Sequence, residues 1–272
     1  MKLYIILSIH DEYDHLYKIL ELIKNQTGIN HSNVVVYIID SSFNAQAQIE
    51  SQLAKKYRMM RIQYHKVPIN FYWSKMNNFG IREISKISKK SDLVLFLNVD
   101  VEFEKTFFHD IFSLYSKEQD FILSACISED YYAKLHCGVR IITRKFKVID
   151  NLVLNDFYGD RYLTLQPTTV STRSTVYPAR IFHLGLRIRH ALLPHYFADL
   201  VLGLEAQELG LDIKFHSAIQ ITNTRNPSVS KLSSNFFIRY FSKGSPTRLI
   251  SILVFWMFVF KFEIKKFMKN YF

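Results

Sequence analysis

The apolar and polar positions of the first hundred residues alternate between the patterns of buried strands and of amphipathic helices. Leu3–Ile9 is a compact apolar run that predicts a buried strand. Apolar residues then recur at helical spacing from Leu16 to Ile23, and Asp11 stands where a helix N-cap is expected. The chain is therefore predicted to open with a strand that leads into a helix.

The same order of strand and helix repeats further along the chain. The additional predicted elements are strand Val34–Ile39 with a polar helical segment around Ile49, strand Arg61–Val67 with helix Ser74–Ile87, and strand Leu93–Leu97. Strands that are joined by helices run parallel, because each crossover returns the chain to the same edge of the sheet. The pattern predicts an α/β fold with a doubly wound, mostly parallel sheet of the Rossmann-like kind.

Composition limits the class of protein. The 272 residues, 49% of them hydrophobic, suffice for one large core or two small ones and show no sign of disorder. Cys126 and Cys137 lack zinc-ligand spacing, so we expect separate buried thiols in a reducing compartment. The N-terminal apolar stretch meets Asp11 without a small-residue cleavage site, unlike a secretory signal. These features predict a cytoplasmic globular protein.

The chain is strongly basic, and the excess charge is concentrated near its C-terminus. Lys and Arg outnumber Asp and Glu by 35 to 24, a net charge of +11. This balance favours an anionic partner, which can be a nucleic acid, a phosphorylated ligand or an acidic membrane surface. Between Arg225 and Phe272, the only acidic residue is Glu263. No surface of interleaved basic and aromatic residues is evident outside this segment, which argues against nucleic-acid binding.

Polar side chains follow three of the predicted strands where each strand ends. Asp11 follows the first strand, Asp40 the second, and Asn98 with Asp100 the strand Leu93–Leu97. In such sheets, ligands bind outside the carboxyl ends of the strands. Neither GxGxxG nor GxxxxGK[ST] occurs, so a divalent cation held by carboxylates is the simplest way to neutralise a pyrophosphate there. The alternative is that these residues only begin polar loops, with Asp40 capping the next helix.

Four short blocks around these positions resemble a known family, the family 2 glycosyltransferases, and within it the bacterial rhamnosyltransferase-like members. SIHD (Ser8–Asp11) resembles the turn after the family's first strand, and IDSS (Ile39–Ser42) loosely resembles its Asp-Asp-Gly-Ser block. FYWSKMNNFGI (Phe71–Ile81) resembles the aromatic, Asn and Gly segment that precedes the metal strand. LFLNVDVEF (Leu95–Phe103) resembles the DxD motif in a variant with Asn in the first place.

The strongest match lies further along, in LLPHYFADLVLGLEAQELG (Leu192–Gly210). In the family, an Asp at the start of this helix acts as the catalytic base, and the resemblance places it at Asp199. Two positions depart from the family pattern. Val201 stands where a second acidic residue is common, and Asn98 replaces the first Asp of DxD.

The resemblance implies the glycosyltransferase A type of fold and an inverting transfer of a sugar from a nucleoside diphosphate donor. The glycosyl acceptor would be a bacterial surface polysaccharide, such as capsule or lipopolysaccharide, or a lipid-linked glycan. The implied site residues are Asp199 as base, Asp100, Glu102 and His195 around Mg²⁺ or Mn²⁺, and Asp11, Asp40, Asn78 and Asn98 at the nucleotide sugar.

Each of these assignments has an alternative. His195 can instead be a partly buried histidine bonded to backbone, and an aromatic such as Trp73 beside Asn78 can belong to the core. At the level of function, the alternative is a non-catalytic homologue that binds sugar nucleotide or membrane and scaffolds a partner. The departures at Val201 and Asn98 would permit it.

The expected domain division is a transferase domain, residues 1–225, followed by a helical tail, residues 226–272. The transferase domain would comprise a nucleotide-sugar half, residues 1–103, and a glycosyl-acceptor half, residues 104–225.

The tail combines an apolar stretch with lysines. Leu249–Phe260 is apolar apart from Ser251, and twelve helical residues span about 18 Å, short of the ~30 Å hydrocarbon core. Beyond it, Phe260, Ile264, Phe267, Met268 and Tyr271 form one stripe, while lysines occupy the other faces. This pattern is typical of a helix lying on an anionic membrane surface, here on the inner face of the cell membrane. Packing on the transferase domain and a dimer contact are the alternatives.

Overall fold

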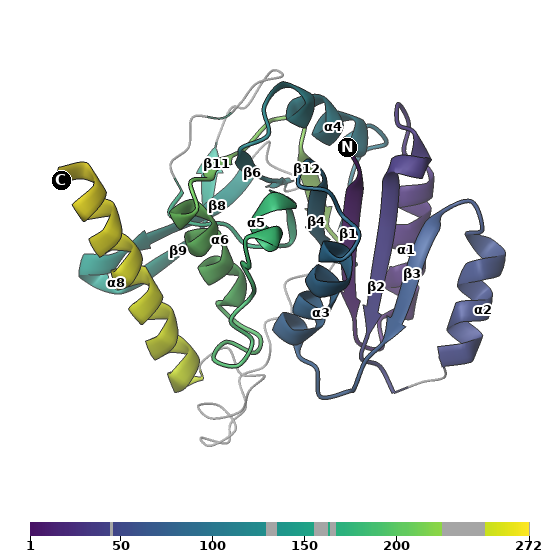
Figure 1. The fold of residues 1–272 in the computed structure, drawn as a ribbon, viewed down its shortest axis with the longest axis horizontal. Helices are drawn as coiled ribbons and strands as arrows, with labels where there is room; N and C mark the ends of the chain where they lie inside the picture. Colours follow the sequence, from purple (N-terminus) through teal and green to yellow (C-terminus); the bar gives the residue numbers. More distant parts are fainter. Residues whose placement is uncertain (44–45, 129–134, 155–162, 164–166, 225–247, 272) are drawn as a thin grey trace.

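The computed structural model describes residues 1–43, 46–128, 135–154, 163, 167–224 and 248–271, and it contains a large and a small sheet. The large sheet has seven strands in the order β11-β6-β10-β4-β1-β2-β3 (Figure 1). The bounds of its first four strands are β1 Leu3–Ile9, β2 Val34–Asp40, β3 Arg61–Lys66 and β4 Leu93–Leu97. These four strands run parallel, as the alternation of strand and helix patterns predicts.

The helices that connect these strands also lie close to their predicted positions. They are α1 Tyr13–Lys24, α2 Gln46–Lys56 and α3 Trp73–Ser85. The predicted N-cap of α1 is wrong, because Glu12 and not Asp11 occupies that position. Asp11 has a φ of 56° and turns the chain between β1 and α1. Left-handed backbone is uncommon outside glycine but is tolerated by Asp and Asn.

Two cores lie on opposite faces of the large sheet. Leu3, Ile5 and Leu7 of β1 belong to the core that α1, α2 and α4 (Phe107–Lys117) cover. Tyr4 and Ile6 face the other core, beneath α3, α5 (Arg180–His183) and α6 (Ala198–Glu208). The doubly wound α/β prediction is thus confirmed, because successive strand residues point to opposite, equally apolar layers.

The chain beyond β4 adds strands that the sequence analysis does not predict. β10 (Ser174–Pro178) runs antiparallel to both β4 and β6 (Phe121–Ser124), and β11 (Asp212–Lys214) extends the edge parallel to β6. The small sheet has the order β5-β12-β7-β8-β9. Its strands are β5 Val101–Glu102, β7 Cys126–Ser128, β8 Leu135–Ile142, β9 Lys147–Leu154 and β12 Gln220–Asn223.

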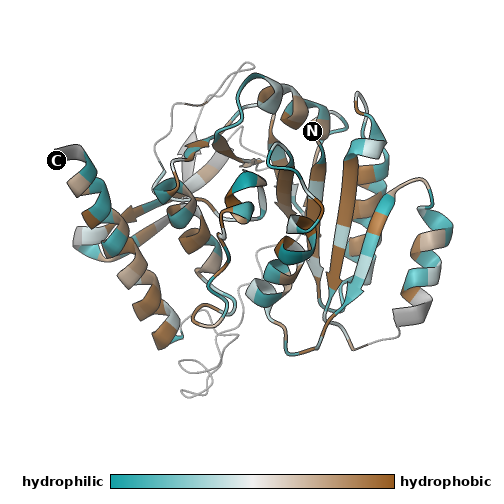
Figure 2. Cartoon of the chain, viewed as in Figure 1, coloured by the Kyte–Doolittle hydropathy of each residue, from teal (hydrophilic) through white to brown (hydrophobic). Residues whose placement is uncertain are grey.

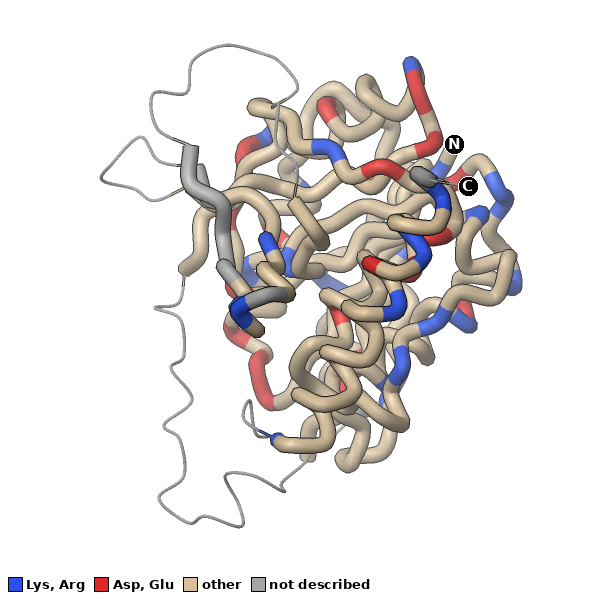
Figure 3. The backbone as a smooth tube through the Cα atoms, turned by 90° about the vertical axis from the view of Figure 1, so that its left-hand side faces the viewer, with Lys and Arg blue, Asp and Glu red and all other residues tan. Residues whose placement is uncertain are grey.

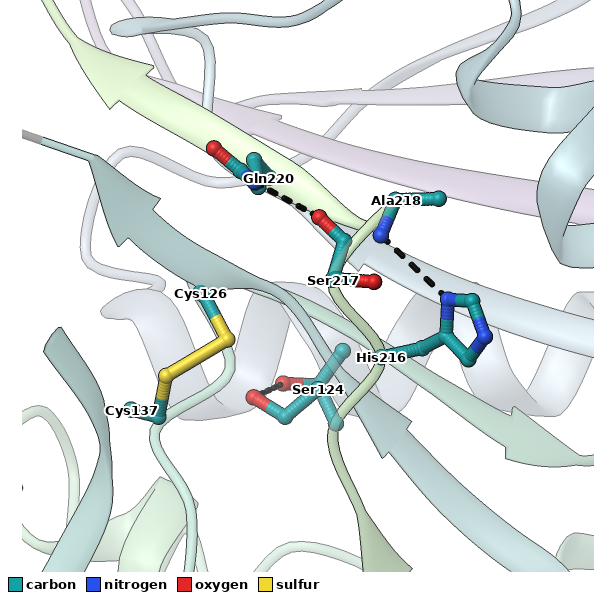
Figure 4. Close-up of a disulfide and its surroundings, with 8 residues drawn as sticks. Ser124, Cys126, Cys137, His216, Ser217, Ala218 and Gln220 are labelled. Carbon is teal, nitrogen blue, oxygen red and sulfur yellow. Dashed lines mark hydrogen bonds between the residues drawn. A yellow bond between two sulfur atoms is a disulfide. The ribbon is translucent and has the colours of Figure 1, made fainter. Parts of the chain in front are cut away.

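The two cysteines are joined by a disulfide within the small sheet (Figure 4). β7 and β8 pair antiparallel with Ile127 opposite His136, a register that puts Cys126 opposite Cys137. Their Cα atoms lie 4.7 Å apart, within the range that a disulfide bridges. The expectation of separate thiols is therefore wrong, because the strand pairing was not visible in the sequence. The inference of a reducing compartment loses the support that it drew from those thiols.

The C-terminal helix α8 (Leu249–Tyr271) packs against α6. Phe255, Val259 and Phe262 of α8 are buried in the same core as α6. Glu208 of α6 forms ion pairs with two lysines of α8, Lys261 at 3.8 Å and Lys265. Packing on the domain thus accounts for one face of the tail. Residues 226–247, the first part of the predicted tail, lie outside the described residues.

The other face of α8 is exposed and apolar over much of its length. Its exposed apolar side chains are Leu249, Ile250, Leu253, Met257, Phe260, Ile264, Phe267 and Met268. The helix changes from mainly hydrophobic in its N-terminal half to mainly hydrophilic in its C-terminal half (Figure 2). Lysines gather in that second half, toward the chain end (Figure 3). None of the described helices combines the length and the apolar character that crossing a membrane requires.

Candidate active site at the carboxyl edge of the large sheet

The carboxyl ends of β1 and β2 are tied together by their polar residues. His10 Nδ1 and Ser41 Oγ lie 3.0 Å apart, and the Asp11 amide donates to Ser42 Oγ at 2.6 Å. The Phe43 amide donates in turn to Asp11 Oδ1 at 3.3 Å. The SIHD and IDSS segments therefore form a single polar rim, with the Asp11 side chain partly exposed on it.

Asp40 lies beneath this rim with no exposed surface. Its Oδ2 accepts from the hydroxyls of Tyr13, at 2.9 Å, and Tyr64. Its Oδ1 accepts from the Ser42 amide at 2.7 Å and lies 3.5 Å from Lys66 Nζ. Burial alone would raise the pKa of Asp40, but the hydrogen bonds from Ser42, Tyr64 and Tyr13 outweigh it and lower the pKa. Both oxygens are thus occupied by the protein, which favours an organising role for Asp40 at the strand end.

A cavity of about 410 Å³ opens at this edge, where β1 and β2 end and α3 begins. Its walls combine polar residues of the strand ends with aromatic residues before and within α3. The lining residues are Ser8, His10, Glu12, Ser41, Phe43, Ile69, Phe71, Tyr72, Trp73, Met76 and His195. The sequence analysis did not single out His10 or Ser41, although both lie inside the SIHD and IDSS blocks.

His195 reaches this cavity from a distant part of the chain. Ser74 at the start of α3 is fully buried; its Oγ donates to the Leu193 carbonyl at 2.6 Å and its amide to the Pro194 carbonyl at 3.2 Å. These bonds hold the segment before α6 against the N-terminus of α3. The cavity is therefore built by both predicted halves of the transferase domain.

Asn98, Asp100 and Glu102 lie at the junction between the two sheets. The Asn98 amide donates to the Arg173 carbonyl at 2.9 Å, beside the start of β10. The Asp100 carbonyl accepts from the Thr224 amide at 2.9 Å, and Glu102 is exposed on β5. These bonds fix the chain as it leaves the large sheet, and they use backbone atoms of Asn98 and Asp100.

Among the described residues, no three or more His, Cys, Asp and Glu side chains gather as a potential metal site. The structure therefore does not bring Asp100, Glu102 and His195 together as a three-ligand set. Of these three residues, only Asp100 is half-buried, and it lies three residues after the end of the parallel strand β4. One carboxylate, completed by substrate phosphates and water, is a donor set that Mg²⁺ commonly uses, so the residues present fit a cation held largely by its substrate.

Asn78 lies on α3, and its side chain anchors a neighbouring segment. Its Nδ2 donates to the Ile188 carbonyl at 2.7 Å, and its Oδ1 accepts from the Ile188 amide at 2.8 Å. The Nδ2 also lies 2.9 Å from His190 Nδ1. Asn78 does not line the cavity at the strand ends and instead lines a second cavity, which shares Phe71 with the first.

Asp199 lies in the first turn of α6, two residues after the N-cap Phe197, which is left-handed with a φ of 66°. It is half-buried, and its charge is close enough to act on Tyr177 of β10. Burial raises the pKa of the Tyr177 hydroxyl, and the negative charge of Asp199 raises it further.

The helix that carries Asp199 is set closely against the chain before β10. Thr169 Oγ1 donates to the Leu200 carbonyl at 2.6 Å. A Cβ atom at Gly203 would clash with the same Thr169 Oγ1, so only glycine fits at this approach. The position of the helix that carries Asp199 is therefore fixed by close packing against Thr169.

Similar proteins are found by comparing three-dimensional structures and not by comparing sequences. The sequence matches no protein-family model and no curated protein. Residues 1–349 of TarS from S. aureus superpose with a TM-score of 0.60 at 15% identity over 82% of this chain. GalNAc-T7, solved with UDP, GalNAc and Mn²⁺, gives a TM-score of 0.64 at 9% identity over 82%. The chain has a glycosyltransferase A fold.

A third glycosyltransferase A structure, the mannosyltransferase PcManGT from Pyrobaculum calidifontis in complex with GDP-Man and Mn²⁺, gives a TM-score of 0.58 at 8% identity over 83% of this chain. The chain spans 60%, 44% and 57% of the TarS, GalNAc-T7 and PcManGT chains, respectively. At such identities the likeness shows the fold. The resemblance of the short sequence blocks to nucleotide-sugar transferases is thereby confirmed at the level of the glycosyltransferase A fold.

Proposed function

We propose that this protein is an inverting glycosyltransferase that moves a hexosyl or deoxyhexosyl group from a nucleoside-diphosphate donor to a bacterial surface polysaccharide or a lipid-linked glycan. The observation that carries the proposal is the cavity at the carboxyl edge of a glycosyltransferase A fold, where His10 and Ser41 of one half meet His195 of the other. The solved neighbours that bind UDP-GlcNAc or GDP-Man support a nucleotide-sugar donor.

In the proposed reaction, Asp199 acts as general base on the hydroxyl of the glycosyl acceptor. The hydroxyl oxygen forms a bond to the anomeric carbon while the bond to the diphosphate oxygen breaks, and its electron pair leaves with the nucleoside diphosphate. The proton passes to the Asp199 carboxylate. Because the hydroxyl displaces the diphosphate directly, no covalent enzyme intermediate is required. The position of Asp199 in the first turn of a helix seated beside the cavity segment suits this role.

The donor would occupy the cavity at the strand ends. Asp11, on the polar rim formed by the ends of β1 and β2, and Asn98, just after β4, are proposed to contact parts of the donor that extend beyond the cavity. Asp40 acts beneath the rim by holding Ser42 and Tyr13 in place. Trp73 in the cavity wall offers an aromatic face to the nucleotide. Asn78 is proposed to shape the neighbouring segment 188–190 rather than to contact the nucleotide.

We propose Mg²⁺ or Mn²⁺ as the cofactor. The cation would neutralise charge on the departing diphosphate. Asp100 is the residue that would hold it, with substrate phosphates and water completing the coordination, because the structure does not bring Glu102 and His195 together with it as a three-ligand set. Two neighbours contain Mn²⁺ in their solved complexes, which supports a divalent cation in this fold.

Titration calorimetry with UDP, dTDP and GDP sugars, each with Mn²⁺ and again with a chelator, tests donor and cation together. We expect one nucleotide to bind with Mn²⁺ and to bind at least about tenfold more weakly with chelator, because the diphosphate charge is then uncompensated. Asp100→Asn is expected to reproduce the chelator result, and Asp110→Asn on α4 serves as the matched control. Failure of every sugar nucleotide to bind would contradict the proposal.

A non-catalytic sugar-nucleotide-binding scaffold is the second candidate function. Val201 in place of a second acidic residue, with Asn98 in place of the first DxD aspartate, is the observation that favours it. Slow hydrolysis of the bound donor in the absence of a glycosyl acceptor separates the two. An enzyme releases free sugar and nucleoside diphosphate, whereas a scaffold leaves the donor intact.

We further propose that the exposed apolar face of α8 docks on an anionic membrane surface, which would place the protein on the inner face of the cell membrane. Met257 is 70% exposed in the middle of that face, and Lys266 and Lys269 are exposed further along the same helix. An apolar helix face flanked by lysines is suited to the headgroup region of anionic lipid.

Sedimentation with vesicles tests this placement. The protein is expected to bind vesicles of phosphatidylcholine with phosphatidylglycerol and to bind pure phosphatidylcholine weakly. Met257→Glu should abolish the binding. Met59→Glu is the control and should leave it intact, because Met59 is 85% exposed and precedes β3, the edge strand of the large sheet opposite β11. If Met257→Glu leaves vesicle binding intact and instead dissociates a dimer in size-exclusion chromatography, the face is a contact between copies.

A further inference from the structure

A second and larger cavity, of about 790 Å³, lies between α3 and the segment 187–192. Among the described residues, every charged side chain that lines it is basic. The lining residues are Phe71, Lys75, Asn78, Phe79, Arg82, Arg187, Ile188, Arg189, His190, Ala191 and Leu192. A concave site to which the described part of the chain contributes guanidinium and ammonium groups but no carboxylate is suited to an anionic ligand.

Two of these cations are not neutralised by the described part of the chain. Arg187 Nη1 donates to the Phe182 and Leu186 carbonyls, each at 2.6 Å, and Lys75 Nζ lies 3.9 Å from the centre of the Phe71 ring. Neither forms an ion pair with a described carboxylate, whereas Arg82 pairs with Glu83 and Arg189 with Glu205. Burial lowers the pKa of Arg187, and a bound anion would offset that cost.

The cavity is well placed to hold one end of a substrate whose other end lies at the strand ends. Phe71 lines both cavities. The segment that forms one wall, up to Leu192, continues directly to His195 in the first cavity. The clamp between Asn78 and Ile188 fixes this wall on α3. A ligand here would lie beside the proposed donor cavity rather than in it.

The cavity also adjoins the start of α8. Arg248 Nη1 donates to the Leu192 carbonyl at 3.4 Å, and Leu192 is itself exposed at the rim. Leu249 and Ile250, the first residues of the exposed apolar face, follow immediately. A phosphate in the cavity and a hydrocarbon chain along α8 could therefore belong to one molecule.

We propose that the basic cavity binds a phosphate group of the glycosyl acceptor, so that the acceptor is a phosphorylated glycan or a lipid diphosphate. This inference rests on the proposed transferase function and deepens it. Lys75 and Arg187 donate charge-assisted hydrogen bonds to the phosphate oxygens. The volume exceeds what a phosphate needs, and the remainder accommodates the adjoining sugar, polyol or first isoprenyl unit, against Phe71 and Phe79.

The test measures binding of three probes to the full chain: a glycerol phosphate oligomer, farnesyl diphosphate and a neutral maltose oligomer. At least one phosphate probe is expected to bind and the neutral one not. Lys75→Gln and Arg187→Lys should each weaken that binding about tenfold, as expected for one charge-assisted hydrogen bond. Lys105→Gln, which removes an exposed charge outside both cavities, should leave it unchanged. Preference for one probe assigns the phosphate to a phosphodiester glycan or to a lipid diphosphate.

Three outcomes overturn the proposal. The first is equal binding by wild type and by Lys75→Gln, a variant at an exposed position that should fold normally. The second is loss of vesicle binding by Lys75→Gln while no phosphate probe binds, because the cavity would then serve bilayer headgroups. The third is a loss that His10→Ala reproduces, because the probe would then occupy the donor cavity. Titration of Lys75→Gln with the sugar nucleotide separates failure of this inference from failure of the proposed function. The variant should bind the donor as wild type does, whichever way the phosphate probes behave.

Discussion

Replacing Asp199 by asparagine is expected to lower the rate of sugar transfer by about 10²- to 10⁴-fold, the contribution typical of a positioned general base. Asparagine has nearly the same shape but cannot take the proton of the acceptor hydroxyl. Donor affinity should be unchanged, because Asp199 does not line the donor cavity. Transfer is measured as released nucleoside diphosphate, and donor binding is measured by calorimetry on the same preparation.

The matched control for this substitution is Asp212→Asn. Asp212 is exposed on the edge strand β11, so the same chemical change there should leave turnover at the wild-type level. Wild-type turnover in Asp199→Asn would show that another group acts as base. An equal loss of turnover and of donor affinity would instead indicate that the change disturbs the site as a whole.

Replacing Asp40 by alanine is expected to destabilise the fold by about 3 kcal/mol or more, because several buried donors lose their acceptor at once. The Tyr13 and Tyr64 hydroxyls and the Ser42 amide all donate to this carboxylate, and Lys66 loses its ion pair. Urea unfolding gives the free energy of unfolding directly. Asp212→Ala, at an exposed position, is the control and should cost little.

The stabilisation by Asp40 is also expected to depend on pH. The pKa of Asp40 is lowered in the folded state, so its contribution is complete above the unfolded-state value of about 3.9 and is lost as the pH falls through the folded-state pKa below it. The difference in unfolding free energy between wild type and Asp40→Asn should therefore be constant near neutral pH and shrink below about pH 4. A difference that persists unchanged under acid would contradict the assignment.

The sequence predicted the first four strands and three helices well, for a local reason. β1, β2 and β4 are buried on both faces and therefore read as continuous apolar runs, while α1 places its buried residues at helical spacing. The turn after β1 was misjudged, because Asp11 as an N-cap and Asp11 in a left-handed turn look alike in sequence. The positive φ of Asp11 and the bond from its amide to Ser42, just beyond β2, distinguish them.

The site residues divide in the same way. Chemical type and strand-end position made Asp11, Asp40, Asn98 and Asp100 candidates from the sequence, and the resemblance added Asp199 as a candidate. The clamp by Asn78, the burial of Asp40 and the lining of both cavities depend on contacts between residues far apart in the chain. The bond between Ser74 and Leu193 spans 119 positions, and no local pattern predicts it.

By itself, the sequence determined the α/β class, the parallel direction of the first strands and the basic, amphipathic C-terminus. Burial and helical periodicity appear as local patterns of apolar residues, which the sequence shows directly. The tertiary structure decided which of those residues meet. It paired Cys126 with Cys137, turned one face of α8 toward α6 and left the other exposed, and gathered Lys75 and Arg187 into one cavity. Strand register and helix packing set such contacts, and they are properties of the whole chain rather than of any segment.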